Sequence, residues 1–384
     1  MDGIAGTRSR LTWAMHISVA LIVAIWLIPT IGLLVSSFRE RDQIGETGWW
    51  QALSGVEQTF RTTIAADGAE PRAGGGSVLT GNVFTDSADA EEFAGTEAEI
   101  NAFGVTGFRP AEFPAGTEAE TRAGGTLSVQ PNGDFRMTSP EPMEGGQRIY
   151  FAAQMPPSFT LGNYQTVMTS DGMGQAFVNT LTVSIPATVI PILIAAFAAY
   201  ALAWMDFPGR GLLIAAVVGL LVVPLQIALV PLLSLHQSIG IGQSFYGIWF
   251  AHTGYGLPLA IYLLRNYMVG LPRDIIESAK VDGATDFQVF TRIILPLSFP
   301  ALASFAIFQF LWTWNDLLVA KVFLPSDSES WVMTRKIADD LLGSRGGDWG
   351  ILASAAFVSI AVPILVFFSM QRYLVRGLLA GSVK

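Results

Sequence analysis

Six apolar segments dominate the pattern of hydrophobic and polar positions along the chain. They lie near residues 14–36, 176–204, 212–235, 245–264, 297–324 and 351–371. Roughly 20 helical residues cross the hydrocarbon core of a bilayer, and each segment is long enough to do so. Several contain proline, which membrane helices tolerate when neighbouring helices satisfy the freed carbonyls. The pattern predicts an all-α polytopic membrane protein with six transmembrane helices, some of them kinked.

Composition agrees with a membrane location. The chain has 51% hydrophobic and only 14% charged residues, whereas about 25% charge is typical of soluble domains. Arg8 and Arg10 precede the first segment, as in a secretory signal. Its apolar run is longer than a signal peptide needs, and no persuasive A-x-A cleavage site follows. We therefore expect a retained membrane anchor.

Basic residues in the short connections predict the orientation of the helices. If six helices alternate, the following residues fall on one side, which the positive-inside rule makes cytoplasmic: Arg8, Arg10, Arg210, Arg265, Arg273, Lys280, Arg292, Arg372, Arg376 and Lys384. Arg335, Lys336 and Arg345 are a mild exception between the last two helices. Both termini are expected to be cytoplasmic.

The segment from 38 to 165 differs in character from the rest. It is rich in Gly, Thr, Ala and Glu and holds 8 arginines, no lysine and 18 acidic residues, a formal charge of −10. The remaining residues are close to neutral, so the chain's acidic excess lies here. Such a face disfavours nucleic acid and anionic lipid. We expect an external domain inserted between the first two helices.

Short alternating segments in this insert indicate β structure. Residues 74–84 and 124–135 alternate β-forming and turn residues. The sequence EFAGTEAE at 92–99 recurs as EFPAGTEAE at 112–120. These features favour a small β-rich domain with a duplicated element, and disorder is the alternative because the segment is rich in glycine.

Residues 272–296 form a charged stretch between two apolar segments. Pro272 suits the start of a short helix, and Glu277 suits its first turns, where the helix dipole favours negative charge. Gly283 interrupts that helix, and Phe287, Phe290 and Ile294 then recur at helical spacing. Two short helices meeting at a glycine on the basic side of a membrane protein favour a docking site for a soluble partner. An amphipathic loop resting on the membrane surface is the alternative.

The same stretch resembles the cytoplasmic EAA loop of ABC-type importer permeases. The similarity is carried by Glu277, Ser278, Ala279, Asp282, Gly283, Ala284, Ile293, Ile294, Leu295 and Pro296, with Ser278 in place of the usual alanine. In that family, the loop inserts into a cleft of the ATPase subunit and transmits its closure to the membrane helices. The resemblance therefore implies that this chain couples to ATP hydrolysis in another subunit.

Further segments narrow the resemblance to carbohydrate importers of the maltose and α-glucoside class, in particular their second permease subunit. They are PLQIALVPL at 224–232, residues 257–274, TWND at 313–316 and the ending QRYLVRGLLAGSVK. The maltose permease has a much shorter segment after its first helix, whereas α-glucoside permeases carry a comparable insert. The resemblance thus implies import of an α-glucoside such as maltose, trehalose or sucrose, with glucosylglycerol also open.

The resemblance also implies partners and a location. They are a companion permease forming a heterodimer, two copies of a cytoplasmic ATPase that uses ATP and Mg²⁺, and a periplasmic sugar-binding protein. The implied location is the bacterial inner membrane. The chain would divide into residues 1–37 with the first helix, a periplasmic insert at 38–165, and a permease core at 166–384. Within that core, the external loop at 325–350 would reach into the cleft of the binding protein.

Candidate residues for the sugar pathway lie in the fifth apolar segment. Spacings of three and four place Gln309, Trp312, Asn315 and Asp316 on one helical face. Amide, carboxylate and indole groups suit sugar hydroxyls and the apolar faces of pyranose rings, and a carboxylate in a membrane helix is usually functional. Alternatively, Trp312 and Trp314 are packing residues and Asp316 bonds a neighbouring helix. Weaker candidates are Asn179, Thr180 and Gln226.

Motifs for catalysis are missing from the sequence. There is no cysteine, and His16, His236 and His252 are far apart, so neither a disulfide framework nor a metal site is expected. There is no phosphate-binding loop, nucleophile elbow or H-E-x-x-H sequence. The chain is therefore expected to be a transport subunit and not an enzyme. An ion-coupled secondary transporter and a membrane-anchored adhesion or sensor protein remain alternatives.

Overall fold

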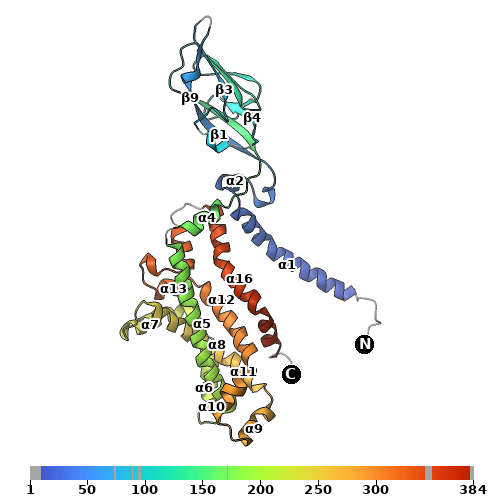
Figure 1. Ribbon diagram of the computed structural model, residues 1–384, viewed down its shortest axis with the longest axis vertical. Helices are drawn as coiled ribbons and strands as arrows, with labels where there is room; N and C mark the ends of the chain where they lie inside the picture. Colours follow the sequence, from blue (N-terminus) through green and yellow to red (C-terminus); the bar gives the residue numbers. More distant parts are fainter. Residues whose placement is uncertain are drawn as a thin grey trace. The chain divides into compact units, whose positions relative to one another are not determined.

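The computed structural model describes residues 10–72, 75–88, 90–93, 97–170, 172–341 and 348–380. The chain forms two compact units, Met1–Asn163 and Tyr164–Lys384 (Figure 1). Three basic residues used in the orientation argument, Arg8, Arg345 and Lys384, lie outside the described residues.

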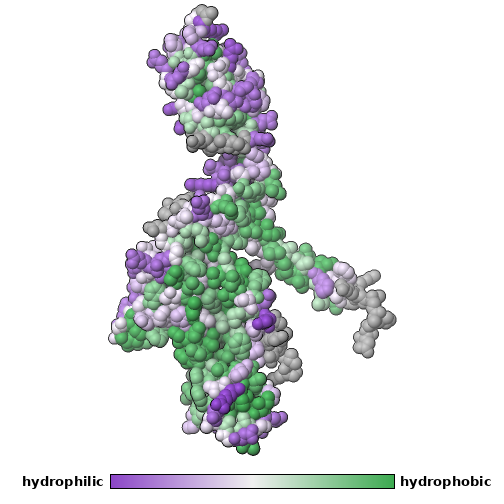
Figure 2. Space-filling view, in the orientation of Figure 1, coloured by the Kyte–Doolittle hydropathy of each residue, from purple (hydrophilic) through white to green (hydrophobic). Residues whose placement is uncertain are grey.

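The first unit begins with a long apolar helix, α1 (Arg10–Ser37), followed by the short helix α2 (Arg41–Glu46) and the 3₁₀ turn η1 (Trp49–Gln51). The segment Leu11–Ser37 is long and apolar enough to cross a membrane. Figure 2 shows hydrophobic residues covering the visible face of α1, whereas the strands of the same unit carry many hydrophilic residues.

The strands of the first unit form two antiparallel sheets. One has the order β1-β9-β4-β5, and the other has the order β2-β3-β8-β7-β6. In chain order the strands are β1 (Val56–Ala65), β2 (Glu70–Pro71), β3 (Ser77–Asn82), β4 (Glu99–Gly104), β5 (Phe113–Pro114), β6 (Glu118–Glu120), β7 (Thr126–Val129), β8 (Asp134–Ser139) and β9 (Gly146–Met155). The first strand pairs with the last over their full length, from Val56 opposite Met155 to Ala65 opposite Gly146. That pairing closes the domain at its two chain ends.

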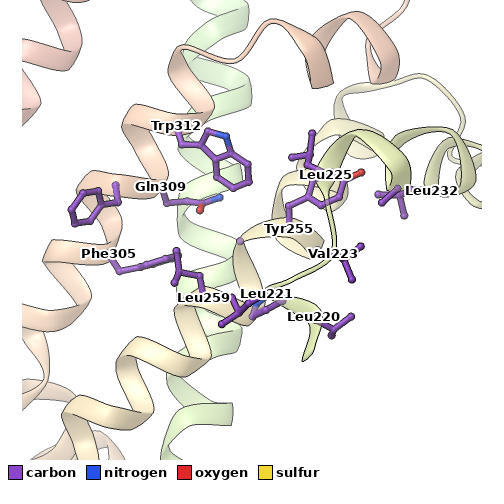
Figure 3. Close-up of a pocket in the computed structure, with 15 residues that line it drawn as sticks. Leu220, Leu221, Val223, Leu225, Leu232, Tyr255, Leu259, Phe305, Gln309 and Trp312 are labelled. Carbon is purple, nitrogen blue, oxygen red and sulfur yellow. The ribbon is translucent and has the colours of Figure 1, made fainter. Parts of the chain in front are cut away.

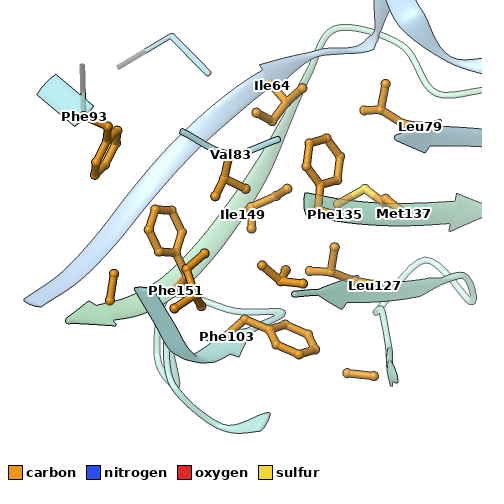
Figure 4. Packing of buried hydrophobic residues seen from close by; sticks show 14 residues of the cluster. Ile64, Leu79, Val83, Phe93, Phe103, Leu127, Phe135, Met137, Ile149 and Phe151 are labelled. Carbon is orange, nitrogen blue, oxygen red and sulfur yellow. The ribbon is translucent and has the colours of Figure 1, made fainter. Parts of the chain in front are cut away.

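Both sheets contribute side chains to one hydrophobic core (Figure 4). Ile149 and Phe151 of β9 come from one sheet, and Leu79 of β3 and Phe135 of β8 come from the other. The short helix α3 (Ala90–Phe93) adds Phe93, whose ring lies 5.0 Å from that of Phe60. The expectation of a β-rich insert is confirmed, because these alternating residues bury one face of each sheet.

The repeated sequence does not produce a repeated structure. In the first copy Phe93 ends a helix, whereas in the second copy Phe113 lies in strand β5. The inserted residue is Pro114, and a proline disfavours the helical conformation of the residue before it. The described parts of the two copies therefore differ at their start, and residues 94–96 of the first copy lie outside the described residues.

The second unit is helical apart from its connections. Its elements are α4 (Gly162–Thr169), α5 (Met173–Trp204), α6 (Arg210–Leu220), α7 (Leu225–Ser238), α8 (Phe245–Val269), α9 (Arg273–Val281), α10 (Asp286–Val289), the π-helical turn η3 (Phe290–Ile294), α11 (Leu295–Leu297), α12 (Phe299–Trp314), α13 (Leu318–Phe323), η4 (Ser328–Ser330), α14 (Met333–Lys336), η5 (Ile337–Leu341) and α16 (Trp349–Ala380). Figure 1 shows α5, α12 and α16 running alongside one another.

Among the described residues, three helices are long and apolar enough to cross a membrane, or up to five if each of two bent pairs is one span. The three are Leu11–Ser37, Met173–Trp204 and Trp349–Tyr373. The apolar segment at 212–235 is not one helix, because α6 and α7 meet at 110°. Pro224 stands at this break and disfavours a helical Val223. The segment at 297–324 also breaks, because α12 ends at Trp314.

Prolines inside the long helices leave carbonyl groups that the helix itself cannot pair, because proline has no N–H for the carbonyl four residues earlier. In α5, Pro186 frees the carbonyl of Thr182, which accepts a hydrogen bond of 2.8 Å from Nε1 of Trp249 in α8. In α16, Pro363 frees the carbonyl of Ser359, which accepts one of 2.9 Å from Nε1 of Trp314 in α12. Each of these proline-containing helices is thus joined to its neighbour by a side-chain hydrogen bond.

The β-domain core makes a first prediction. Phe151 is fully buried, and its replacement in Phe151→Ala should cost about 3–5 kcal/mol of the domain's stability. Phe108→Ala is the matched control, because Phe108 is 93% exposed and such surface changes stay within about 0.5 kcal/mol. Chemical denaturation of residues 55–156 expressed alone would measure both. Non-cooperative unfolding of the unsubstituted fragment would contradict an independent core.

The proline contacts make a second prediction, on the Trp314–Pro363 pair. Trp314→Phe leaves the Ser359 carbonyl unpaired and should destabilise the protein by about 1–3 kcal/mol. In a Pro363→Ala background, the restored N–H of residue 363 can pair that carbonyl, so Trp314→Phe should cost less. A double-mutant cycle on thermal unfolding in detergent measures this coupling. Additive effects would show that Trp314 contributes only by packing.

Candidate functional site

The stretch from 272 to 296 forms two short helices around a glycine. Helix α9 ends at Val281, and Gly283 has φ of +84°, a left-handed conformation that side chains with a Cβ disfavour. The N–H of Ala284 donates to the carbonyl of Ala279 at 3.0 Å, which closes the end of the helix. Lys280 pairs with Asp286 across the turn at 3.1 Å. The bend is therefore built into the local backbone.

The residues that carry the resemblance to the EAA loop divide by exposure. Glu277, Ser278, Asp282, Gly283 and Pro296 are exposed, and Ala279, Ala284, Ile293 and Leu295 are partly buried. The sequence grouped Phe287 with Phe290 and Ile294 on one helical face, but Phe287 is 65% exposed whereas the other two are buried. Val281, which is apolar and 87% exposed, was not singled out from the sequence.

The opposite face of the loop packs against the long helices. Ile276, Val289 and Phe290 are buried in one cluster with residues of α5 and α8. The hydroxyl of Tyr200, near the end of α5, donates to Asp286 at 3.3 Å. The buried face of the loop therefore contacts residues near the ends of α5 and α8.

Gln309 of α12 is buried and turned toward backbone. Its Nε2 donates to the carbonyl of Ala187 at 3.1 Å, and Ala187 is the residue whose carbonyl Pro191 leaves unpaired. A Cβ at Gly256 of α8 would lie 2.6 Å from Oε1 of Gln309, so this glycine makes room for the amide. The amide thus serves the packing of α5, α8 and α12.

Trp312 lies at the edge of a cavity of ≈ 650 Å³. Figure 3 shows Gln309 and Trp312 on the α12 side, Tyr255 and Leu259 from α8, and Leu225 and Leu232 from α7 on the other side. The lining is mostly apolar. Trp314 is different, because it is buried against Phe177 and Phe310.

Asn315 and Asp316 do not continue the face of α12. The helix ends at Trp314, so Asn315 caps it and Asp316 lies in the following turn. The carboxylate of Asp316 accepts a hydrogen bond from the N–H of Ala320 in α13 at 3.2 Å. The expected four-residue stripe therefore extends only from Gln309 to Trp312.

The carboxylate of Asp316 faces a histidine that sequence reasoning did not place there. Its Oδ2 lies 3.8 Å from Nε2 of His252, which is fully buried in α8. The ring of His252 meets that of Trp312 edge to face, with 5.7 Å between centroids. Among the described residues, no hydrogen-bond partner lies within reach of either ring nitrogen of His252 or of the hydroxyl of Tyr255. Polar groups of α8 and α12 thus gather beside the cavity.

The weaker pathway candidates have other positions. Asn179 of α5 donates to the carbonyls of Glu329 and Trp331 at 2.6 and 2.9 Å. Thr180 accepts a hydrogen bond from the N–H of Met333 at 2.9 Å. Both residues therefore fasten the loop that follows α13 to the end of α5, while Gln226 is exposed in α7.

Charged residues hold the same loop together. Lys321 pairs with Asp339 at 2.6 Å, and Arg335 lies 3.5 Å from the same carboxylate. The guanidinium of Arg335 also lies over the ring of Trp331, at 4.7 Å from its centroid. Residues 342–347 of the expected external loop lie outside the described residues. Among the described residues, no three His, Asp or Glu side chains are grouped as ligands for a metal ion.

Comparison with known proteins places this geometry in a family. Residues 146–379 match the model of the binding-protein-dependent transport system inner membrane component. The chain is 56% identical to the alpha-glucoside transport system permease protein AglG of Rhizobium meliloti, over 98% of both chains. It is 54% identical to the osmoprotective compounds uptake permease protein GgtD of Synechocystis sp., over 67% of this chain and 84% of that one.

A third relative is the trehalose transport system permease protein SugB of Mycobacterium tuberculosis. The chain is 35% identical to it, over 60% of this chain and 84% of that one. AglG and SugB are named as transport permeases for alpha-glucosides and trehalose, and this chain is likewise a transport component and not an enzyme. The chain belongs to the family of binding-protein-dependent transport system inner membrane components, as a multi-pass inner-membrane permease of an ABC sugar importer.

Proposed function

We propose that this chain is the second permease subunit of an ATP-driven importer of α-glucosides. The observation that carries the proposal is the similarity to AglG, because 98% coverage of both chains includes the insert as well as the helices. The match to GgtD covers only 67% of this chain. An α-glucoside such as maltose, trehalose or sucrose is the proposed cargo.

Coupling to the ATPase would run through the loop at 272–296. Its exposed side offers both charged and apolar groups, since Glu277 and Asp282 lie near Val281 and Phe287 on the same two short helices. Its buried side reaches α5 and α8. ATP and Mg²⁺ would be bound by two copies of a separate ATPase, whose closure would move this loop and with it the two helices.

The remaining assembly follows the same proposal. A companion permease would supply the other half of the pathway, with both termini of this chain cytoplasmic and residues 38–165 periplasmic. The loop at 325–350 would contact the periplasmic sugar-binding protein. In support, Asn179 and Thr180 hold this loop against α5, so the binding protein would act on the same helix as the ATPase.

For the sugar pathway, we propose the group formed by Trp312, Asp316, His252 and Tyr255, beside the cavity of α7, α8 and α12. An indole face suits the apolar side of a pyranose, and the other groups can donate to or accept from hydroxyls. Gln309 would border the pathway without binding the sugar through its amide, because that amide donates to the carbonyl of Ala187. Asn315 is exposed at the end of α12 and would lie at the edge of this group.

Uptake by vesicles tests the proposal as a whole. The chain, its companion permease, the ATPase and the binding protein are reconstituted, and radiolabelled maltose, trehalose and sucrose are offered with and without internal ATP. We expect ATP-dependent uptake of at least one sugar that an ionophore does not abolish. Uptake driven by an ion gradient without ATP would instead establish a secondary transporter.

Gly283 gives a prediction about coupling. A Cβ at Gly283 would meet open space, so Gly283→Leu acts mainly through its left-handed backbone, at about 1–2 kcal/mol. The rearranged elbow should abolish uptake and the stimulation of ATPase activity by the binding protein, with the protein still inserted. Gly240→Leu is the control, because Gly240 has φ of +83° and equally open surroundings. Normal uptake by Gly283→Leu, or equal loss in both variants, would contradict the coupling role.

The two tryptophans give a prediction about the pathway. Trp312→Ala should weaken sugar uptake at normal protein level, because Trp312 borders the cavity. Trp314→Ala should lower protein abundance, since removal of a buried tryptophan costs about 3–5 kcal/mol. Asp316→Asn keeps the shape and an acceptor for Ala320, so it should change the kinetics of uptake and leave abundance unchanged. Equal effects of both tryptophan changes, with reduced abundance, would assign Trp312 to packing.

A further inference from the structure

The chain reverses direction directly after the first membrane-length helix. The guanidinium of Arg39 is buried and donates to the carbonyls of Gln43 and Thr47 at 2.8 and 3.0 Å. It also donates to the hydroxyl of Thr47 at 2.6 Å. These bonds fold α2 back over the end of α1 and direct the next residues along the helix instead of away from it.

The turn at 47–54 consequently lies against the side of α1. The ring of Trp49 packs on Gly32, where a Cβ would lie 2.7 Å from its Nε1. Gly32 precedes the last helical residue, Ser37, by five positions, about 7.5 Å along the axis at 1.5 Å per residue. The indole of Trp49 is therefore beside the last part of a candidate membrane span and not beyond it.

Two large apolar side chains of this turn are uncovered. Trp50 is 72% exposed and Leu53 is 83% exposed. The ring centroids of Trp49 and Trp50 are 6.1 Å apart, so Trp50 lies beside the ring that packs on Gly32. Leu33 and Leu34 of α1 are exposed as well, so the apolar surface of the helix continues onto the turn.

The chain that returns from the β domain is fixed at the same level. The N–H of Thr160 donates to the carbonyl of Phe38 at 2.7 Å, and the amide of Asn163 donates to the carbonyls of Ser37 and Arg39 at 3.0 and 2.8 Å. Phe159 and Leu161, which flank Thr160, are exposed. Apolar side chains thus surround the end of α1 from both directions of the chain.

We propose that the 47–54 turn is a lipid-binding surface that inserts Trp50 and Leu53 into the headgroup region of the bilayer beside α1. Three observations support lipid as the occupant: the candidate span itself, the continuity of its exposed apolar surface with the turn, and the depth of Trp49. Interfacial segments bury their apolar face about 5–10 Å into the boundary between headgroups and acyl chains. Tryptophan is enriched at that level because its ring is apolar and its N–H is polar.

The proposal gives the turn a function in the insert domain. Both ends of the β domain would be held at the membrane surface by the turn and by the hydrogen bonds to Ser37, Phe38 and Arg39. It depends on α1 crossing the bilayer and on neither the cargo nor the coupling loop. The surface of the companion permease is the other possible occupant, and water is the third outcome.

The absence of cysteine makes the test direct. Trp50→Cys and Leu53→Cys each introduce one thiol for a bimane fluorophore, in the full importer complex assembled with cysteine-free partner subunits in lipid nanodiscs. Leu21→Cys, at an exposed position in the middle of α1, is the control for lipid contact, and Phe108→Cys, in the β domain, is the control for water. Fluorescence is measured with phospholipids carrying a nitroxide in the headgroup or on the acyl chain, and with iodide in solution.

Labels at 50 and 53 should lose more fluorescence with the headgroup nitroxide than with iodide, whereas the label at 108 should respond to iodide alone. The label at 21 should respond best to the acyl-chain nitroxide. Quenching of positions 50 and 53 by iodide alone would place the turn in water and overturn the proposal. Protection from both quenchers would also overturn it, because a protein surface would then cover the turn.

Discussion

Carbonyl groups released by proline determine how the long helices of this permease are held together. In α5, Pro186 and Pro191 have no N–H to donate to the carbonyls of Thr182 and Ala187. In α16, Pro363 likewise leaves the carbonyl of Ser359 without its helical donor. Side chains of other helices replace those partners: Trp249, Gln309 and Trp314. Helices in lipid associate through van der Waals packing and interhelical hydrogen bonds, and each such bond contributes about 0.6 kcal/mol. These bonds join specific positions, so they help to fix which helices meet and at what height.

This arrangement also explains which parts of α12 are available for function. Gln309 and Trp314 each have their polar group engaged by backbone of another helix. Trp312 lies between them in sequence, and its exposed ring borders the cavity beside His252 and Tyr255. Since its two neighbours hold α12 in place, the position of Trp312 is set without using its own side chain. The structural roles of Gln309 and Trp314 thus leave the ring of Trp312 at the cavity.

The sequence predicted the kinds of element better than their ends and contacts. The β character of the insert followed from alternating residues such as those of 124–135, whose side chains do alternate between core and surface. The single helix expected at 297–324 is not found, because hydropathy does not register the break after Trp314. The elbow at Gly283 was readable from one glycine in a helical pattern. The partner of Gln309 was not readable, since it is a carbonyl 122 residues away whose availability depends on Pro191.

Helix α5 has a special position because it contacts the elements at both of its ends. Near its start, Asn179 and Thr180 bond the backbone of the loop around Trp331. Near its end, the hydroxyl of Tyr200 donates to Asp286 of the loop at 272–296. Between these two ends lie Pro186 and Pro191. The carbonyls that they leave unpaired, those of Thr182 and Ala187, accept hydrogen bonds from Trp249 of α8 and Gln309 of α12. Proline weakens a helix locally, and neighbouring helices can pair the carbonyls that it frees, so these hydrogen bonds leave neither freed carbonyl of α5 without a partner. The same prolines that weaken α5 as an isolated helix therefore tie it to α8 and α12 within the helical unit.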